Sequence, residues 1–283
     1  MATPKHTSTK RTPAERRARR QRLARRAGLV VLALALAAAW TWQRTLPLER
    51  IAVVGAVHAS ADEVAALTNV VPDSVALFSL SPALMADRAQ RHPWVETASV
   101  RRMPNGTLRI AVDERRPVVL VLDGNGRPSH FLDAEGFAMP ASGATPALYD
   151  VPVMHDAPPY HAVQPVESDG LRSLLAALAT AGPAELALVS EIDWGRQVTV
   201  WTTPAGGHGS IQVRLGHADQ GRQLRALRAF WDQSVLPRPE TPFDLVDLRF
   251  DGQVVTREGE PPAADSTARA GGGAPPLAAS AST

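Results

Sequence analysis

The sequence predicts an α+β fold: a single N-terminal transmembrane helix, a small β-α-α-β-β domain, and then a mixed α+β domain with a largely antiparallel sheet. Three observations lead to this prediction. An uncharged apolar segment follows a run of arginines near the N-terminus. Residues 47–117 combine short strand patterns with two capped helical segments, and residues 118–258 combine period-two strands with helical patterns. A chain of 283 residues can bury a sizeable core.

An apolar segment predicts one membrane-spanning helix over residues 27–46. Residues 27–43 contain no charge, and 17 residues are slightly fewer than the ~20 that span a ~30 Å hydrocarbon core. The apolar stem of Arg44 lets the helix extend past this segment. Trp40 and Trp42 stand where an interfacial aromatic belt is found. The alternative is a cleaved signal peptide with an A-x-A site at residues 35–37.

The charge distribution predicts the orientation of this helix. Residues 1–26 carry ten Lys or Arg against one acidic residue, Glu15, which leaves 20 basic and 27 acidic residues in the rest of the chain. Because positive charge favours the cytoplasmic side, we expect the N-terminus in the cytoplasm and the remainder outside it. The alternative interpretation is that these arginines bind DNA or lipid. The acidic remainder gives no support to nucleic-acid binding.

The region 47–117 predicts the order β-α-α-β-β. A strand over residues 48–54 ends at Gly55, and Ser60 with Glu63 predicts a capping box at the first helix. A serine and a proline at residues 81 and 82 begin a second helix, which should end near residue 91. A hairpin then follows with its turn at residues 103–106.

The region 118–258 predicts a second domain. Residues 140–165 are rich in proline and predict an irregular surface passage. Helices are expected over residues 171–178 and 218–234, and the last strand pattern alternates Val246, Leu248 and Phe250. The other predicted strands cover residues 118–122, 191–203, 211–215 and 254–255.

No residue pattern indicates catalysis or a bound cofactor. The chain has no cysteine and its eight histidines lack metal-ligand spacing, so no metal site, cofactor or small-molecule substrate is predicted. We expect Glu114 and residues 115 and 116 to form the solvated end of a strand. Asp123 and Asp133 each begin a turn that the aspartate can cap. We expect Trp94 and Trp231 to be core residues.

The hairpin region carries a long motif, which consists of Pro93, Trp94, Val95, Ala98, Val100, Arg102, Pro104, Leu108, Ile110, Val112, Glu114, Arg115 and Pro117. This motif resembles the POTRA domain of the FtsQ/DivIB family of bacterial cell-division proteins. The layout of a basic tail, one anchor and an adjacent POTRA domain is similar as well.

This resemblance implies a non-enzymatic divisome scaffold in the inner (plasma) membrane, enriched at the division septum, that binds proteins of the FtsB and FtsL type. Binding would use the last β strands and a nearby helix of the C-terminal domain. An edge strand offers unpaired backbone groups to a partner; the competing interpretation is an edge covered by the tail. The implied partner-binding residues are Phe250, Gly252, Gln253, Val254, Val255, Arg222 and Arg225.

Other interpretations remain open at this point. They are a POTRA-containing periplasmic chaperone or polypeptide-transport accessory protein, a periplasmic enzyme with an unrecognised site, and a secreted binding module. Residues 259–283 are dominated by Pro, Ala, Gly, Ser and Thr, which predicts a disordered tail. The predicted organisation is thus a cytoplasmic tail 1–26, an anchor 27–46, a POTRA domain 47–117, a β domain 118–258 and this tail.

Overall fold

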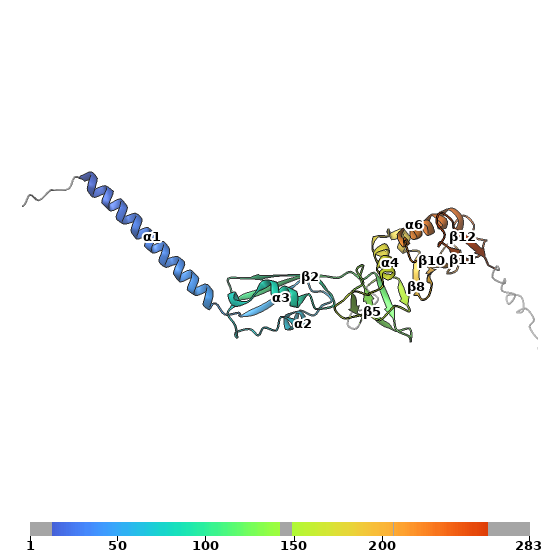
Figure 1. Cartoon of the computed structure of the whole chain (residues 1–283), viewed down its shortest axis with the longest axis horizontal. Helices are drawn as coiled ribbons and strands as arrows, with labels where there is room; N and C mark the ends of the chain where they lie inside the picture. The colour runs from blue at the N-terminus through green and yellow to red at the C-terminus, as the bar shows by residue number, and fades with distance from the viewer. Residues whose placement is uncertain (1–12, 142–148, 206, 260–283) are drawn as a thin grey trace, which may run out of the picture. The chain divides into compact units, whose positions relative to one another are not determined.

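A computed structural model describes residues 13–141, 149–205 and 207–259 of the chain (Figure 1). The described chain divides into two compact units, one ending at Glu114 and the other beginning at Arg115. The predicted disordered tail lies outside the described residues except for Gly259, as does the start of the basic tail. Each unit is described by itself.

Helix α1 (Pro13–Thr45) contains the membrane anchor. Its apolar part, Ala24–Thr45, has 22 residues, a mean hydropathy of 1.4 and no buried residues. At 1.5 Å per residue it is about 33 Å long, which matches a hydrocarbon core of about 30 Å. Both observations support the predicted N-terminal transmembrane helix.

A three-stranded sheet forms the framework of the first unit. Strand β3 (Thr107–Glu114) lies in its centre, parallel to β1 (Arg50–Val54) and antiparallel to β2 (Val95–Arg102). The predicted alternation along β3 is confirmed, because its apolar residues Leu108 and Ile110 are fully buried. The sheet therefore buries the apolar face that the sequence predicts.

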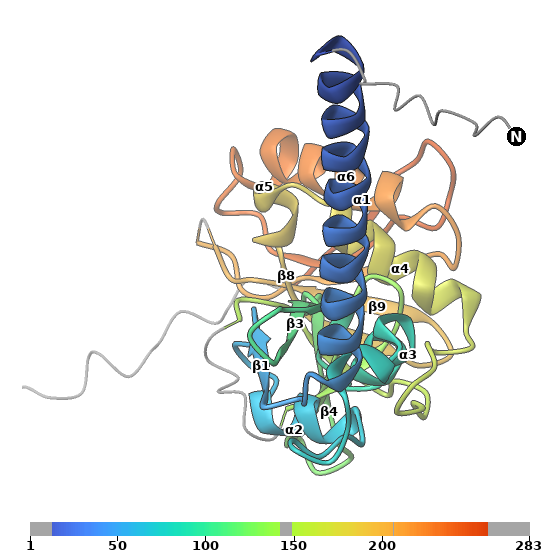
Figure 2. The same ribbon diagram turned by 90° about the vertical axis from the view of Figure 1, so that its left-hand side faces the viewer.

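Two helices pack on this sheet. Helix α2 (Ala61–Leu67) lies beside β1 (Figure 2), and α3 (Pro82–Ala89) contacts β2. A short 3-10 helix, η1 (Leu77–Ser79), lies between the two helices in the sequence. Leu48, Leu77, Met85 and Leu108 form one buried cluster. The order β-α-α-β-β is the one predicted.

The predicted capping box is wrong. Ser60 occupies the N-cap position of α2, but its side chain makes no capping hydrogen bond. Glu63, the other half of the expected box, instead has Oε2 3.2 Å from Nε2 of His92. The nearly buried His92 draws this carboxylate away from the helix terminus. Ser81 does cap α3, since its hydroxyl accepts a hydrogen bond from the backbone N–H of Leu84.

A nine-stranded mixed sheet forms the framework of the second unit. Its order is β12-β11-β10-β9-β8-β7-β4-β5-β6, and three neighbouring pairs, β4–β7, β7–β8 and β10–β11, are parallel. The strands are β4 (Val119–Leu122), β5 (Pro128–Leu132), β6 (Ala138–Pro140), β7 (Val153–His155), β8 (Val189–Trp194), β9 (Val198–Thr202), β10 (Gln212–Leu215), β11 (Phe243–Asp247) and β12 (Val255–Glu258).

Helices α4 (Asp169–Thr180) and α6 (Gln220–Phe230) pack beside each other against this sheet (Figure 1). A short helix α5 (Pro183–Leu186) contacts α6, and a π-helical turn η3 (Trp231–Val235) follows it. The helical periods were predicted correctly, because the four leucines of α4 are all buried. Trp231 is 2% exposed, as expected of a core residue.

The proline-rich passage contains a strand that the sequence interpretation missed. Residues 153–155 form β7, which lies inside the sheet between β4 and β8. Met154 is fully buried there. The prediction of an irregular surface passage over residues 140–165 is therefore wrong for this part. A three-residue strand is too short to show a period.

The last strand pattern was also predicted incorrectly in part. Val246 and Leu248 are buried, but β11 ends at Asp247, and Phe250 is 52% exposed. Asp247, expected on the solvent side, is 5% exposed. The chain leaves the sheet after Asp247, so the alternation of apolar residues continues in the sequence beyond the strand.

Candidate protein-interaction site

The candidate site is the border of the large sheet formed by β12. This strand is the outermost of the nine in the described structure, paired with β11 on one side. All four of its residues are exposed. The N–H and C=O groups on the open side of an edge strand lack ladder partners, so such a border can accept a strand from another chain.

The backbone hydrogen bonds show which residues of β12 direct their N–H and C=O groups to the open side of the sheet. The N–H of Gly259 donates to the carbonyl oxygen of Pro242 at 2.8 Å, so Gly259 faces inward, toward the chain that begins β11. Alternate residues of a strand direct their backbone groups to the same side. The backbone N–H and C=O groups of Arg257 and Val255 therefore point toward β11. Those of Thr256 and the neighbouring even-numbered positions point to the open side.

Apolar side chains lie beside this edge. Phe250 is 52% exposed, Val254 40% and Val255 47%. Gly252 has a φ of +68°, a conformation suited to glycine, within the turn that leads into β12. The N–H of Gln253 donates to the carbonyl oxygen of Phe250 at 3.2 Å and closes that turn. The structure thus places these five predicted site residues together.

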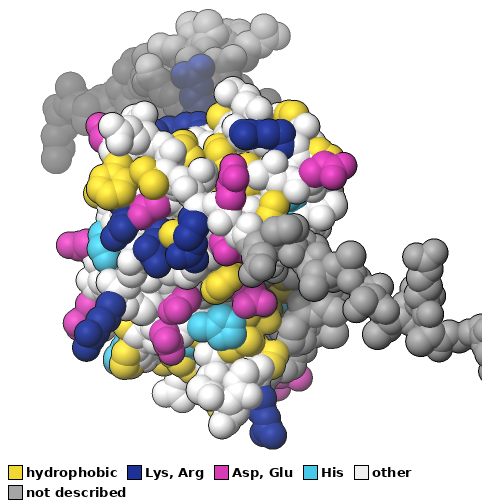
Figure 3. Space-filling view, turned by 90° about the vertical axis from the view of Figure 1, so that its right-hand side faces the viewer, with side chains coloured by type: hydrophobic (Ala, Val, Ile, Leu, Met, Phe, Trp, Pro, Cys, Tyr) yellow, Lys and Arg dark blue, Asp and Glu magenta, His cyan; other side chains and the backbone are white. Residues whose placement is uncertain are grey.

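Helix α6 contributes one arginine that contacts the same turn. Arg222 forms ion pairs with Asp251 in the turn and with Asp219 at the start of its own helix. Arg225, one turn further along α6, is exposed. No carboxylate of the described residues is within ion-pair distance of Arg225. Figure 3 shows a face of the molecule where arginine side chains lie beside hydrophobic ones.

A buried carboxylate fixes the segment between β11 and the turn. Two nitrogens of Arg249 contact Asp247, Nη2 at 2.6 Å from Oδ2 and Nε at 2.9 Å from Oδ1. These hydrogen bonds from Arg249 lower the pKa of Asp247, although its burial acts in the opposite direction. The same guanidinium lies 5.7 Å from the centre of the Phe250 ring. Asp247 and Arg249 were missed as contributors to the site, because their sequence pattern indicated ordinary solvent-facing positions.

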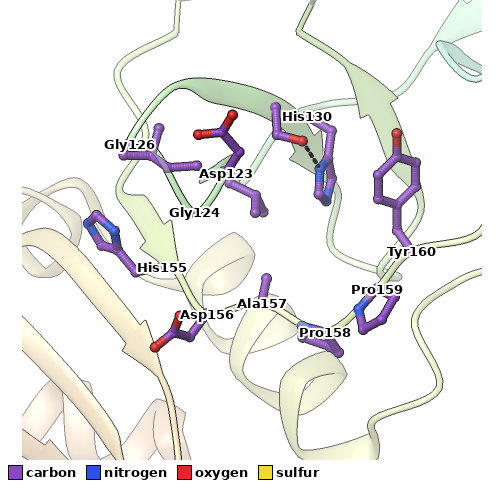
Figure 4. A pocket seen from close by; sticks show the side chains of 13 residues that line it. Asp123, Gly124, Gly126, His130, His155, Asp156, Ala157, Pro158, Pro159 and Tyr160 are labelled. Atoms are coloured by element: carbon purple, nitrogen blue, oxygen red, sulfur yellow. Dashed lines mark hydrogen bonds between the residues drawn. The ribbon is translucent and has the colours of Figure 1, made fainter.

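The second unit also contains a recess of about 430 Å³ between the β4–β5 hairpin and the segment after β7 (Figure 4). His130 lines it, 4% exposed, with Nδ1 3.0 Å from the hydroxyl of Ser129 and its ring 4.0 Å from that of Tyr160. Burial lowers the pKa of His130 to about 4. Its Nε2 has no hydrogen-bond partner among the described residues and is inaccessible to solvent.

The recess contains a buried histidine and a turn-capping aspartate. No group of three His, Cys, Asp or Glu side chains in the described part of the chain could hold a metal ion. His130 stays neutral at physiological pH and its free nitrogen is covered. Asp123, at the rim, uses Oδ1 to accept hydrogen bonds from the N–H groups of Asn125 and Arg127. It acts as the turn cap that the sequence predicts.

Comparison with known proteins supports the assignment of the first unit. Residues 46–115 match the family model described as the FtsQ-type POTRA domain. The cell division protein FtsQ of Rhodothermus marinus is 46% identical over 269 residues, which cover 92% of this chain and 96% of that protein. The chain belongs to the FtsQ family. FtsQ of Salinibacter ruber is 39% identical over 236 residues, 82% of this chain and 89% of that protein.

Membership of the FtsQ family confirms the resemblance read from the hairpin motif. It assigns the chain to bacterial cell division, with a POTRA domain and an N-terminal apolar helix that fits a single-pass inner-membrane protein. FtsQ of Geotalea daltonii is 28% identical over 188 residues, 64% of this chain and 65% of that protein. Similarity to FtsQ proteins therefore extends well beyond the POTRA domain.

Proposed function

We propose that this protein is a non-enzymatic scaffold of the divisome that captures partners of the FtsB and FtsL type at the β12 edge. In this proposal α1 spans the inner membrane, residues 1–26 are cytoplasmic, both compact units are periplasmic, and the protein is enriched at the division septum. The observation that carries the proposal is the exposed outer edge of β12.

The proposed mechanism is strand addition. The partner lies along the open side of β12 and pairs with the outward backbone groups of Thr256 and its even-numbered neighbours. Main-chain hydrogen bonds provide affinity, and contacts with Phe250 and Val254 provide selectivity. The membrane anchor confines both proteins to one surface, which raises their effective concentration.

Proline substitutions test this edge directly. Proline removes a backbone donor and is tolerated in edge strands where that N–H faces solvent. Thr256→Pro and Val254→Pro should therefore leave both units folded and weaken capture of a purified FtsB–FtsL complex by the full chain in nanodiscs at least tenfold. Binding would be followed by surface plasmon resonance.

Val255→Pro is the matched control, because it removes an N–H directed at β11. We expect this variant to lower the melting temperature, whereas the two outward variants should not. Wild-type affinity in Thr256→Pro and Val254→Pro would contradict the proposed edge. Midcell localisation of a fluorescent fusion tests the septal assignment separately.

A further inference from the structure

The junction between the membrane anchor and the POTRA domain is short and hydrogen bonded. The N–H of Leu46 still donates to the carbonyl oxygen of Trp42 at 3.0 Å, so the helical bonding continues past the end of α1. The carbonyl oxygen of Leu46 accepts from the N–H of Leu77 at 2.9 Å. The N–H of Leu48 donates to the carbonyl oxygen of Val75 at 3.0 Å. No unpaired linker separates the anchor from the folded domain.

This junction determines how far one end of the POTRA domain lies from the hydrocarbon core of the membrane. An apolar helix of about 33 Å fills the hydrocarbon core, so its end at Thr45 lies near the boundary with the headgroups. Leu48 is three residues further, at most about 10 Å away. The headgroup layer is about 5–8 Å thick on each side. The N–H of Asp73 donates to the carbonyl oxygen of Leu48 at 2.7 Å, which holds the segment around Asp73 at this level.

Two exposed apolar side chains lie at this end. Val71, two residues before Asp73, is 68% exposed. Met103, in the β2–β3 turn, is 37% exposed. That turn belongs to the same end, because the N–H of Glu49 donates to the carbonyl oxygen of Gly106 at 2.8 Å. We call residues 69–75 and 103–106 the POTRA base.

Basic side chains flank the POTRA base. Arg50 is exposed and its Nε donates to the hydroxyl of Thr107 at 3.0 Å, beside the turn. Arg101 is exposed two residues before Met103. Arg44, at the end of α1, has its guanidinium carbon 4.6 Å from the centre of the Trp40 ring. The exposed acidic residues Glu49 and Asp73 lie at this end as well. Exposed apolar groups with arginines nearby are found on surfaces that lie in a lipid interface.

We propose that the POTRA base is a lipid-binding surface. It rests in the headgroup layer of the leaflet at the C-terminal end of α1, with Val71 and Met103 inserted among the lipids and the arginines near phosphates. The observation that selects lipid as the occupant is continuity with the anchor, since the base begins within three residues of the helix end. The attachment would restrict how freely the POTRA domain moves above the membrane.

The absence of cysteine allows a clean test, because each introduced cysteine can be labelled alone. Val71→Cys carries an environment-sensitive NBD probe in the full chain, reconstituted in nanodiscs of phosphatidylethanolamine and phosphatidylglycerol. Val57→Cys is the matched control. Val57 is 80% exposed and follows the far end of β1, which runs for five residues, about 17 Å, away from the base.

We expect the probe at residue 71 to emit at shorter wavelength than the probe at residue 57. Lipids with a nitroxide in the headgroup region should quench it by at least half, and should leave the probe at residue 57 nearly unquenched. Equal quenching of the two probes would overturn the proposal. A second measurement places the probe at Met103→Cys and adds Val71→Asp, which should reduce its quenching at least twofold; no reduction would show that the two residues do not insert together.

Discussion

Arg115 and Asp133 form a nearly buried ion pair at the start of the second unit. Nη1 of Arg115 lies 2.7 Å from Oδ2 of Asp133, and the side chains are 12% and 4% exposed. Oδ1 of the same carboxylate accepts hydrogen bonds from the N–H groups of Glu135 and Phe137. The guanidinium carbon of Arg115 also lies 3.9 Å from the centre of the Phe137 ring. One carboxylate thus holds both a turn and an arginine that the sequence interpretation placed in solvent.

Asp133→Ala should destabilise the second unit by about 3 kcal/mol, because it leaves a buried guanidinium unpaired and removes a turn cap. Asp123→Ala is the matched control. Asp123 caps the β4–β5 turn with the same two-bond geometry, yet it is exposed and no arginine of the described chain pairs with it. Urea unfolding of both variants measures the difference. Equal decreases in the free energy of unfolding would show that the ion pair with Arg115 adds nothing beyond the turn cap.

A second prediction concerns Glu114, whose side chain is 11% exposed. It accepts hydrogen bonds from the N–H groups of Val57, His58 and Ala59, and it contacts Nδ1 of His58 at 2.8 Å. Burial opposes its ionisation, but these hydrogen bonds together outweigh burial and lower the pKa of Glu114. Glu114→Gln should therefore cost about 2 kcal/mol at neutral pH and speed hydrogen exchange at residues 57–59.

The pH dependence of this contact follows from the direction of the shift. Because the pKa of Glu114 is lower in the folded state, its stabilisation is fully present above the ordinary carboxylate pKa. It is lost as the pH falls from that value through the lowered pKa of the folded state. Asp113→Asn is the control for the hydrogen-exchange measurement on Glu114→Gln. Asp113 is the adjacent residue of β3, is exposed, and accepts a hydrogen bond from the hydroxyl of Thr97 at 2.9 Å. If both variants change exchange at residues 57–59 equally, Glu114 is not the group that holds this loop.

A third prediction concerns His130. Burial lowers its pKa to about 4, below the ordinary value of 6.5. Between these values the unfolded chain binds a proton that the folded chain does not, so acidification should lower the free energy of unfolding by up to about 3 kcal/mol. His130→Phe should flatten this part of the pH profile of thermal unfolding. The same substitution at exposed His161 is the control, and parallel profiles for wild type and His130→Phe would contradict the argument.

The sequence predicted the elements whose signals are local. The four leucines of the 12-residue helix α4 recur at helical spacing, and Leu108, Ile110 and Val112 alternate along β3. Both elements bury the face that carries the pattern. β7 has only three residues and parallel neighbours on both sides, so its burial depends on segments distant in the sequence. Its pattern alone could not distinguish it from a loop.

The candidate site was predictable only in outline. The Asp251-Gly252 turn and the position of the last strand indicated an edge, and β12 is the outermost strand of the described sheet. Which backbone groups face outward depends on the bond from Gly259 to Pro242. Likewise, Glu114 was interpreted as solvated because the amides that it binds lie more than fifty residues earlier in the chain. Contacts of this kind have no local sequence signal.

The last prediction distinguishes the two arginines of α6. Arg222 is held by Asp219 and Asp251, whereas no described carboxylate pairs with Arg225. Arg225 is therefore the residue available to an acidic group of a partner bound at β12. Arg225→Glu should weaken capture of the FtsB–FtsL complex about tenfold at low salt, and the difference from wild type should shrink as salt screens the charges. Arg196→Glu makes the same charge change at an exposed position in the β8–β9 turn. Equal weakening by both variants would reflect the overall charge of the unit and would remove Arg225 from the docking surface.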